Sequence, residues 1–152
     1  MRIAFYAPLK SPNHPVVSGD RQIARLLMLA LTHAGHTVEV ASELRAYLPE
    51  ADFARLAALR EEAAAEVERI SAHWQTDARP DLWFTYHPYY KSPDLLGPTL
   101  ADRFDIPYVT AEASHSHRRA IGAWAASQAD VLKSLERASV NFCFTRRDYQ
   151  GL

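Results

Sequence analysis

The first forty residues, MRIAFYAPLKSPNHPVVSGDRQIARLLMLALTHAGHTVEV (1–40), decide the fold class. Arg2 to Ala7 is a short apolar run closed by Pro8, which predicts a strand buried on both faces. Lys10 to Gly19 concentrates proline, serine, asparagine and glycine, which is typical of an irregular loop. A helical pattern follows, and His36 to Ala41 predicts a second strand. The stretch is therefore a strand–loop–helix–strand unit.

The helix inside this unit has a signal at each end. Asp20 is placed to cap its start, and Gly35 supplies the stop at its end. Its apolar positions follow the 3.6-residue period of an amphipathic helix: Ile23, Leu26, Leu27, Ala30, Leu31 and Ala34.

The rest of the chain repeats the alternation of strand and helix. Glu50 to Trp74 is rich in strong helix formers and carries one apolar stripe, and Asp77 to Pro80 breaks this helix. Three further strands and two further helices are predicted over Asp81–Tyr86, Asp94–Phe104, Pro107–Ala111, Ile121–Leu135 and Ser139–Thr145. Five strands alternating with helices predict an α/β fold: a doubly wound, mostly parallel, Rossmann-like or flavodoxin-like sheet with helices on both faces, in the order 2-1-3-4-5.

Composition limits the class of protein further. The chain has 152 residues, which is the size of a single domain, and a formal net charge of −1, which gives no support for a nucleic-acid partner. Its one cysteine, Cys143, excludes an internal disulfide framework. No apolar run is long enough to span a membrane, and the opening run is too short for a signal peptide, so we expect a cytoplasmic protein.

Several common site motifs are absent. One glycine before the first helix does not make the G-x-G-x-x-G of dinucleotide binders, so NAD and FAD are disfavoured and we expect no cofactor. Neither G-x-x-x-x-G-K-[ST] nor G-x-S-x-G occurs, which argues against a P-loop enzyme and an esterase. The first strand ends in Ala7 and Pro8 rather than the acidic residues of a phospho-receiver domain.

In this fold the carboxyl ends of neighbouring strands meet at one cleft, so three loops should converge: Pro8 to Gly19, His87 to Pro93 and Glu112 to Arg119. In the first loop, Ser18, Gly19 and Asp20 either form a simple helix entry or bind an anion at the helix N-terminus. His14 is a candidate general base or a solvated side chain.

The other two loops carry the remaining candidates. His115, His117 and Arg118 form either a cationic patch aimed at phosphate or a solvated loop, and we expect no metal because no carboxylate or cysteine completes a ligand set. Glu112 ends a buried strand and needs a partner, for which Arg118 and Arg119 are local candidates. Aromatic and cationic side chains after the third strand suit a sugar surface or serve as packing: His87, Tyr89, Tyr90 and Lys91.

Four stretches together resemble the N-terminal domain of a GT-B glycosyltransferase, in particular the retaining glycosyltransferase family 4. The most specific is Ser18-Gly19-Asp20-Arg21 at the helix entry, with Leu31-x-x-Ala-Gly-His36-x-Val38 at its end. The others are Met1 to Pro8, Arg79-Pro-Asp81-Leu-Trp-Phe, and the pair Ile106 to Thr110 and Ala138 to Thr145. The resemblance covers essentially the whole chain.

The resemblance implies a two-domain enzyme that transfers a sugar from a nucleotide-sugar to a hydroxylated acceptor, with retention. Residues 1–152 would be its acceptor-side, N-terminal half, with Ser18, Gly19, Asp20 and Arg118 near the donor phosphates or the transferred sugar. His87, Tyr89, Tyr90 and Lys91 would then contact the acceptor, and the catalytic candidates are His14, Glu112, His115 and His117. The family's E-x7-E glutamates belong to a C-terminal donor domain that these residues do not include.

On this interpretation the isolated chain is inactive, and an apolar face left without its partner domain favours a homodimer. The alternative is a free-standing, non-catalytic flavodoxin-like module for a small anion or nucleotide. A third interpretation is a protein-interaction domain that uses the Glu50–Trp74 helix.

Overall fold

The computed structural model describes residues 1–75 and 79–151, and its centre is a five-stranded sheet in the order β2-β1-β3-β4-β5. The strands are β1 (Arg2–Tyr6), β2 (Thr37–Val40), β3 (Leu82–Tyr86), β4 (Tyr108–Ala111) and β5 (Val140–Phe142). All their pairings are parallel. The predicted α/β class, strand order and parallel sheet are therefore confirmed.

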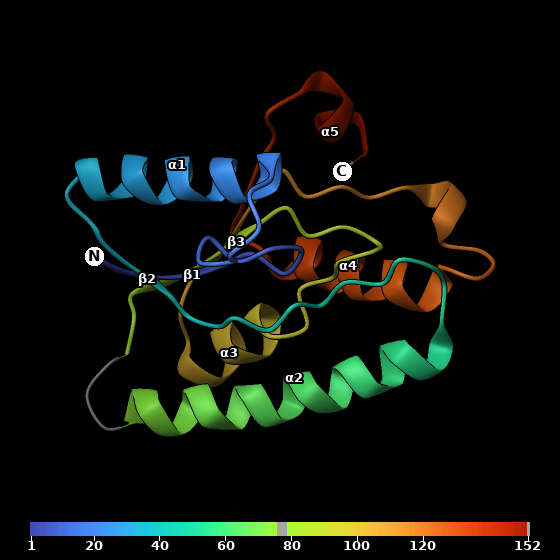
Figure 1. Ribbon diagram of the computed structural model, residues 1–152, viewed down its shortest axis with the longest axis horizontal. Helices are drawn as coiled ribbons and strands as arrows, with labels where there is room; N and C mark the ends of the chain where they lie inside the picture. The colour runs from blue at the N-terminus through green and yellow to red at the C-terminus, as the bar shows by residue number, and fades with distance from the viewer. Residues whose placement is uncertain (76–78, 152) are drawn as a thin grey trace.

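Helices cover both faces of the sheet, as the alternation predicts (Figure 1). One face packs against α1 (Gly19–His33), and the other against α2 (Phe53–His73), α3 (Gly97–Phe104) and α4 (Ala125–Arg137). A short 3₁₀ turn, η2 (His117–Arg119), precedes α4, and α5 (Arg146–Gly151) follows β5. Among residues 1–75 and 79–151, no helix combines the length and the apolar character that crossing a membrane requires.

The long helix α2 is a covering layer of the core. Its predicted apolar stripe is buried in full: Leu56, Leu59, Ala63, Val67, Ile70 and Trp74. The second half of the stripe, from Ala63 to Trp74, packs on large aromatic residues of the sheet and on α3, including Trp83, which is fully buried. Leu56 and Leu59 pack in a separate cluster with Leu48. The stripe is therefore used inside the domain and is not available to a protein partner. The predicted break after this helix, Asp77 to Pro80, lies partly outside the described residues.

A buried carboxylate joins this core to the start of α3. Asp94 is 2% exposed, and its Oδ2 accepts hydrogen bonds from Thr85 Oγ1 at 2.5 Å and Tyr108 Oη at 2.9 Å. Its Oδ1 accepts from the backbone N–H groups of Leu96 and Gly97 at 2.9 and 2.8 Å. These bonds satisfy donors at the helix N-terminus that would otherwise lack partners, so Asp94 caps α3 from within the core.

Two details of α1 differ from the sequence prediction. Its N-cap is Ser18, whose hydroxyl accepts from Arg21 N at 3.3 Å, and Asp20 lies in the first turn instead. Ile23 and Leu26, predicted on the apolar face, are 37% and 51% exposed. The helix is rotated so that Ala24, Leu27, Met28 and Leu31 face the sheet.

The start of α4 and the end of β5 also differ from the sequence prediction, each for a local reason. The fourth long helix begins at Ala125 rather than near Ile121, because Gly122 has a left-handed φ of 85° and Ile121 is 83% exposed. The last strand ends at Phe142 rather than Thr145 because its partner β4 ends at Ala111, and the final ladder bond joins Glu112 N to Phe142 O. Cys143 therefore follows the strand and is only half-buried.

Candidate functional site

Two adjacent strands leave the sheet through the same backbone conformation. His87 follows β3 with φ 58°, and Glu112 follows β4 with φ 56°, both in the left-handed region. Because Tyr86 and Ala111 are register partners, these two residues come next to each other at the carboxyl edge. A left-handed residue with a side chain costs about 1–2 kcal/mol. The sheet holds each one through its N–H, which donates at 2.8 Å to the neighbouring strand.

His87 is joined to the start of α1. Its Nδ1 lies 3.3 Å from Asp20 Oδ1, and the two side chains are 24% and 37% exposed. With a proton on Nδ1 the ring donates to the carboxylate, which fixes its tautomer and leaves Nε2 able to accept a proton. Asp20 therefore serves as the partner of a pocket histidine rather than as the helix cap.

Glu112 carries an oxygen that the described residues leave without a partner. Its Oε2 is buried, and no group within residues 1–75 or 79–151 donates a hydrogen bond to it. Neither Arg118 nor Arg119, the partners expected for this carboxylate, makes an ion pair with it among the described residues. Burial and the adjacent Glu112 carboxyl raise the pKa of Tyr86 well above its ordinary value, so Tyr86 stays protonated. This oxygen therefore lacks the hydrogen bond that usually offsets the burial of a carboxylate.

Ring contacts run without a break from β3 to the start of α4. His87 stacks on Tyr89 with centroids 4.9 Å apart, and Tyr90 contacts Trp124 edge to face at 4.8 Å. The Arg119 guanidinium lies 3.6 Å from the centre of the Tyr90 ring. Burial raises the pKa of Tyr89 to about 12. The faces of these rings are largely occupied by one another and by Arg119. Only His87 and Tyr90 among them line the pocket described next, so the predicted acceptor residue Tyr89 lies outside it.

A pocket of about 660 Å³ opens over these residues. The sequence candidates His87, Tyr90, Glu112, His115, His117 and Arg118 all line it, and Asp20 stands behind His87. His115 and His117 contact each other edge to face, with ring centroids 4.9 Å apart. The loops after β3 and β4 therefore meet in one pocket. The third predicted loop, Pro8 to Gly19, contributes no lining residue, and Asp20 is linked to the pocket only through His87.

Other candidates lie outside this pocket. Lys91 donates from Nζ to Pro49 O at 2.9 Å and lies over the Trp124 ring. His14 Nδ1 accepts from Val16 N at 3.1 Å inside its own loop. Ser18 is occupied as the helix cap, and Gly19 has open space where a Cβ would stand, so no tight backbone approach requires a glycine there.

Sequence reasoning gave no ligand-binding role to several residues that line the pocket, although it considered Arg119 as a partner for Glu112: Ser114, Ser116, Arg119 and Gln150. Ser114 is held there because its N–H donates to Pro88 O at 3.1 Å, which ties the two loops together. Only their place in the predicted loops could have indicated Ser114, Ser116 and Arg119. Gln150 belongs to α5, where the sequence analysis predicted no helix.

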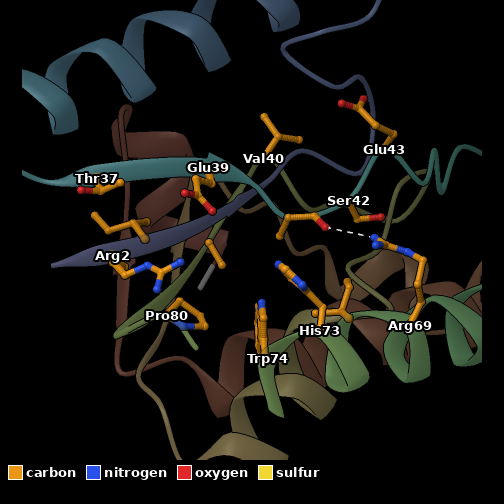
Figure 2. A pocket seen from close by; sticks show the side chains of 14 residues that line it. Arg2, Thr37, Glu39, Val40, Ser42, Glu43, Arg69, His73, Trp74 and Pro80 are labelled. Carbon is orange, nitrogen blue, oxygen red and sulfur yellow. Dashed lines mark hydrogen bonds between the residues drawn. The ribbon is translucent and has the colours of Figure 1, made fainter. Parts of the chain in front are cut away.

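A second, smaller pocket of about 250 Å³ lies at the β2 edge of the sheet, between β2 and the end of α2 (Figure 2). Arg69 points from α2 toward the chain after β2, where it donates to Ala41 O at 3.4 Å. Its guanidinium also holds both oxygens of Glu66, at 2.7 and 2.8 Å. The Ser42 hydroxyl donates to the same carboxylate at 2.5 Å. Because these groups already pair with each other, we place the candidate site at the larger pocket.

The larger pocket combines three kinds of chemistry. His87 with Asp20 can accept a proton, Glu112 can accept a hydrogen bond from a hydroxyl, and Arg118 can bind an anion. Within the described part of the chain, no group of three or more His, Cys, Asp or Glu side chains has the arrangement needed to hold a metal ion. The site is therefore suited to a polar, hydroxylated ligand.

Comparison with protein-family models finds no match for the chain, and comparison with curated proteins finds none either.

Proposed function

We propose that this domain binds the hydroxylated acceptor of a sugar-transfer reaction and forms the acceptor-side half of a two-domain glycosyltransferase. The observation that carries the proposal is the pair of acceptors at the carboxyl edge of the sheet. Glu112 and His87 belong to adjacent strand ends, and both residues line one pocket. Two side chains that can accept hydrogen bonds, both in the lining of one pocket, suit a ligand that presents several hydroxyl groups.

The two side chains have different roles in this proposal. Glu112 accepts a hydrogen bond from one ligand hydroxyl and so orients the acceptor. His87, held by Asp20, takes the proton of the attacking hydroxyl on Nε2. The new glycosidic bond forms as the bond between the anomeric carbon and the donor phosphate oxygen breaks, and the nucleotide leaves with that oxygen. The nucleotide-sugar would come from a donor domain across the cleft, and retention follows from the family resemblance alone.

Binding of unlabelled sugars to the ¹⁵N-labelled chain, followed by NMR, tests the proposal. We expect shifts at the amides of residues 86–90 and 112–119, and loss of binding in Glu112→Gln, which keeps the shape but removes the charge. Glu136→Gln is the matched control, because Glu136 is an exposed acid on α4 outside the pocket. Equal binding by both variants would contradict the role of Glu112.

Activity is tested in the natural full-length protein, with a panel of nucleotide-sugars and hydroxylated acceptors. We expect transfer by that protein, about 100-fold slower transfer after His87→Ala, and none by residues 1–152 alone. Turnover of any donor by residues 1–152 alone would show that a second domain is unnecessary.

A further inference from the structure

The lining of the 660 Å³ pocket is rich in basic side chains. Among the side chains that the structure describes, two arginines and three histidines line it together with one carboxylate, that of Glu112: Arg118, Arg119, His87, His115 and His117. The chain as a whole has a formal net charge of −1, so this clustering is local. A pocket with this balance attracts an anion.

The two arginines differ in how firmly they are held. Arg119 lies 3.6 Å above the Tyr90 ring, and its N–H donates to Ser116 O at 2.9 Å within the η2 turn. The Arg118 guanidinium has no hydrogen-bond or ion-pair partner within the described ranges, although it lines the pocket. Arg119 is therefore held in place by its neighbours, and Arg118 is available to a ligand.

We infer that the hydroxylated ligand of this pocket carries a phosphate monoester. The inference rests on the proposed function in taking that ligand to be the acceptor. The planar guanidinium of Arg118 offers paired donors that match two phosphate oxygens, and His117 and the Ser116 hydroxyl lie beside it on the pocket wall. Glu112 repels a phosphate, so we assign Glu112 to the end of the ligand that carries the hydroxyl groups. A ligand with a phosphate at one end and hydroxyl groups at the other can bind both Arg118 and Glu112.

Calorimetric titration of residues 1–152 with matched probes tests this inference. The probes are glucose 6-phosphate against glucose, with inorganic phosphate as competitor. We expect the sugar phosphate to bind about tenfold tighter or more, with a preference that falls as salt is added. Arg118→Ala should remove most of the preference. Arg79→Ala should retain it, because Arg79 precedes β3 at the opposite, amino edge of the sheet.

Three results would overturn the inference. The first is equal affinity for the two sugars, and the second is an unchanged preference in Arg118→Ala. The third is a nucleoside diphosphate that displaces the sugar phosphate with the same dependence on Arg118, because the patch would then serve the donor.

Activity of the natural full-length protein separates the two proposals. Transfer to neutral acceptors without preference would overturn the phosphate inference and leave the proposed function standing. Binding of sugar phosphate by a full-length protein that transfers no sugar would uphold the phosphate site and overturn the proposed function.

Discussion

Gly97 is the residue at which the core leaves no room for a side chain. A Cβ at this position would lie 2.3 Å from Asp94 Oδ2, 2.5 Å from Trp83 Nε1 and 2.5 Å from Tyr108 Cε2. Ordinary contacts of this kind are about 3.4 Å or longer, so one side must move by about 1 Å. Asp94 cannot turn aside easily, because its other oxygen already holds the N–H groups of Leu96 and Gly97.

The expected cost of Gly97→Ala follows from these contacts. Overpacking a tight core costs about 1–3 kcal/mol, and a weakened hydrogen bond to a charged group adds about 1.5–3 kcal/mol. The better helix propensity of alanine returns at most about 1 kcal/mol. We therefore expect a net loss of about 2–4 kcal/mol in the free energy of unfolding, which lowers Tm by about 10 °C for a domain of this size.

Urea denaturation followed by tryptophan fluorescence measures this loss directly. Gly19→Ala is the matched control, because Gly19 is likewise the first residue of a helix but has nothing within 4 Å of the added carbon. We expect that control to be neutral or slightly stabilising. A Gly97→Ala protein within about 0.5 kcal/mol of the wild type would refute the account of this core.

Three further substitutions probe other parts of the structure. Asp94→Asn should lower the free energy of unfolding by about 2–3 kcal/mol, because either orientation of the amide sets its N–H₂ group against buried donors. An unchanged Tm would contradict this. Glu112→Gly should be about 1 kcal/mol more stable than Glu112→Ala, because both lack the carboxylate and only glycine relaxes at φ 56°; equal urea midpoints would show that no strain is stored. Hydrogen bonds from Arg69 lower the pKa of Glu66, so its stabilisation is present above the ordinary value of 4.5 and is lost as acid protonates the folded state. The stability difference between wild type and Glu66→Gln should therefore be about 0.5–1 kcal/mol at pH 7 and should vanish as the pH is lowered below the pKa of Glu66 in the folded protein. A difference that stays constant with pH would contradict this account.

The fold could be predicted from the sequence because its signals are local and repeated. The apolar run at Arg2 to Ala7 and the stripe along Glu50 to Trp74 each follow the period of their element, and both are buried as expected. Element ends were harder, because they depend on partners. β5 ends at Phe142 because β4 ends beside it, and no residue between Ser139 and Thr145 indicates where the strand ends.

The site was predictable only to the level of its loops. Parallel strands bring their carboxyl ends to one edge, so the convergence of the loops after β3 and β4 followed from topology. Which side chains face the pocket did not follow. Lys91 and Arg119 are both cations in those loops, yet Lys91 reaches Pro49 O while Arg119 lies over Tyr90 at the pocket. That difference arises from loop conformations with no repeating pattern in the sequence.

The backbone at His87 and Glu112 links the fold to the proposed chemistry. Left-handed positions are usually occupied by glycine, and no glycine marks either position in the sequence. The sheet supports both residues, because each N–H completes the ladder to the neighbouring strand at the point where the chain turns away. The two turns bring His87 and Glu112 next to each other along the sheet edge, and both residues line the pocket. Glycine at these positions would relieve the strain but would remove both side chains, so under the proposed function the strain accompanies the two groups that the ligand needs.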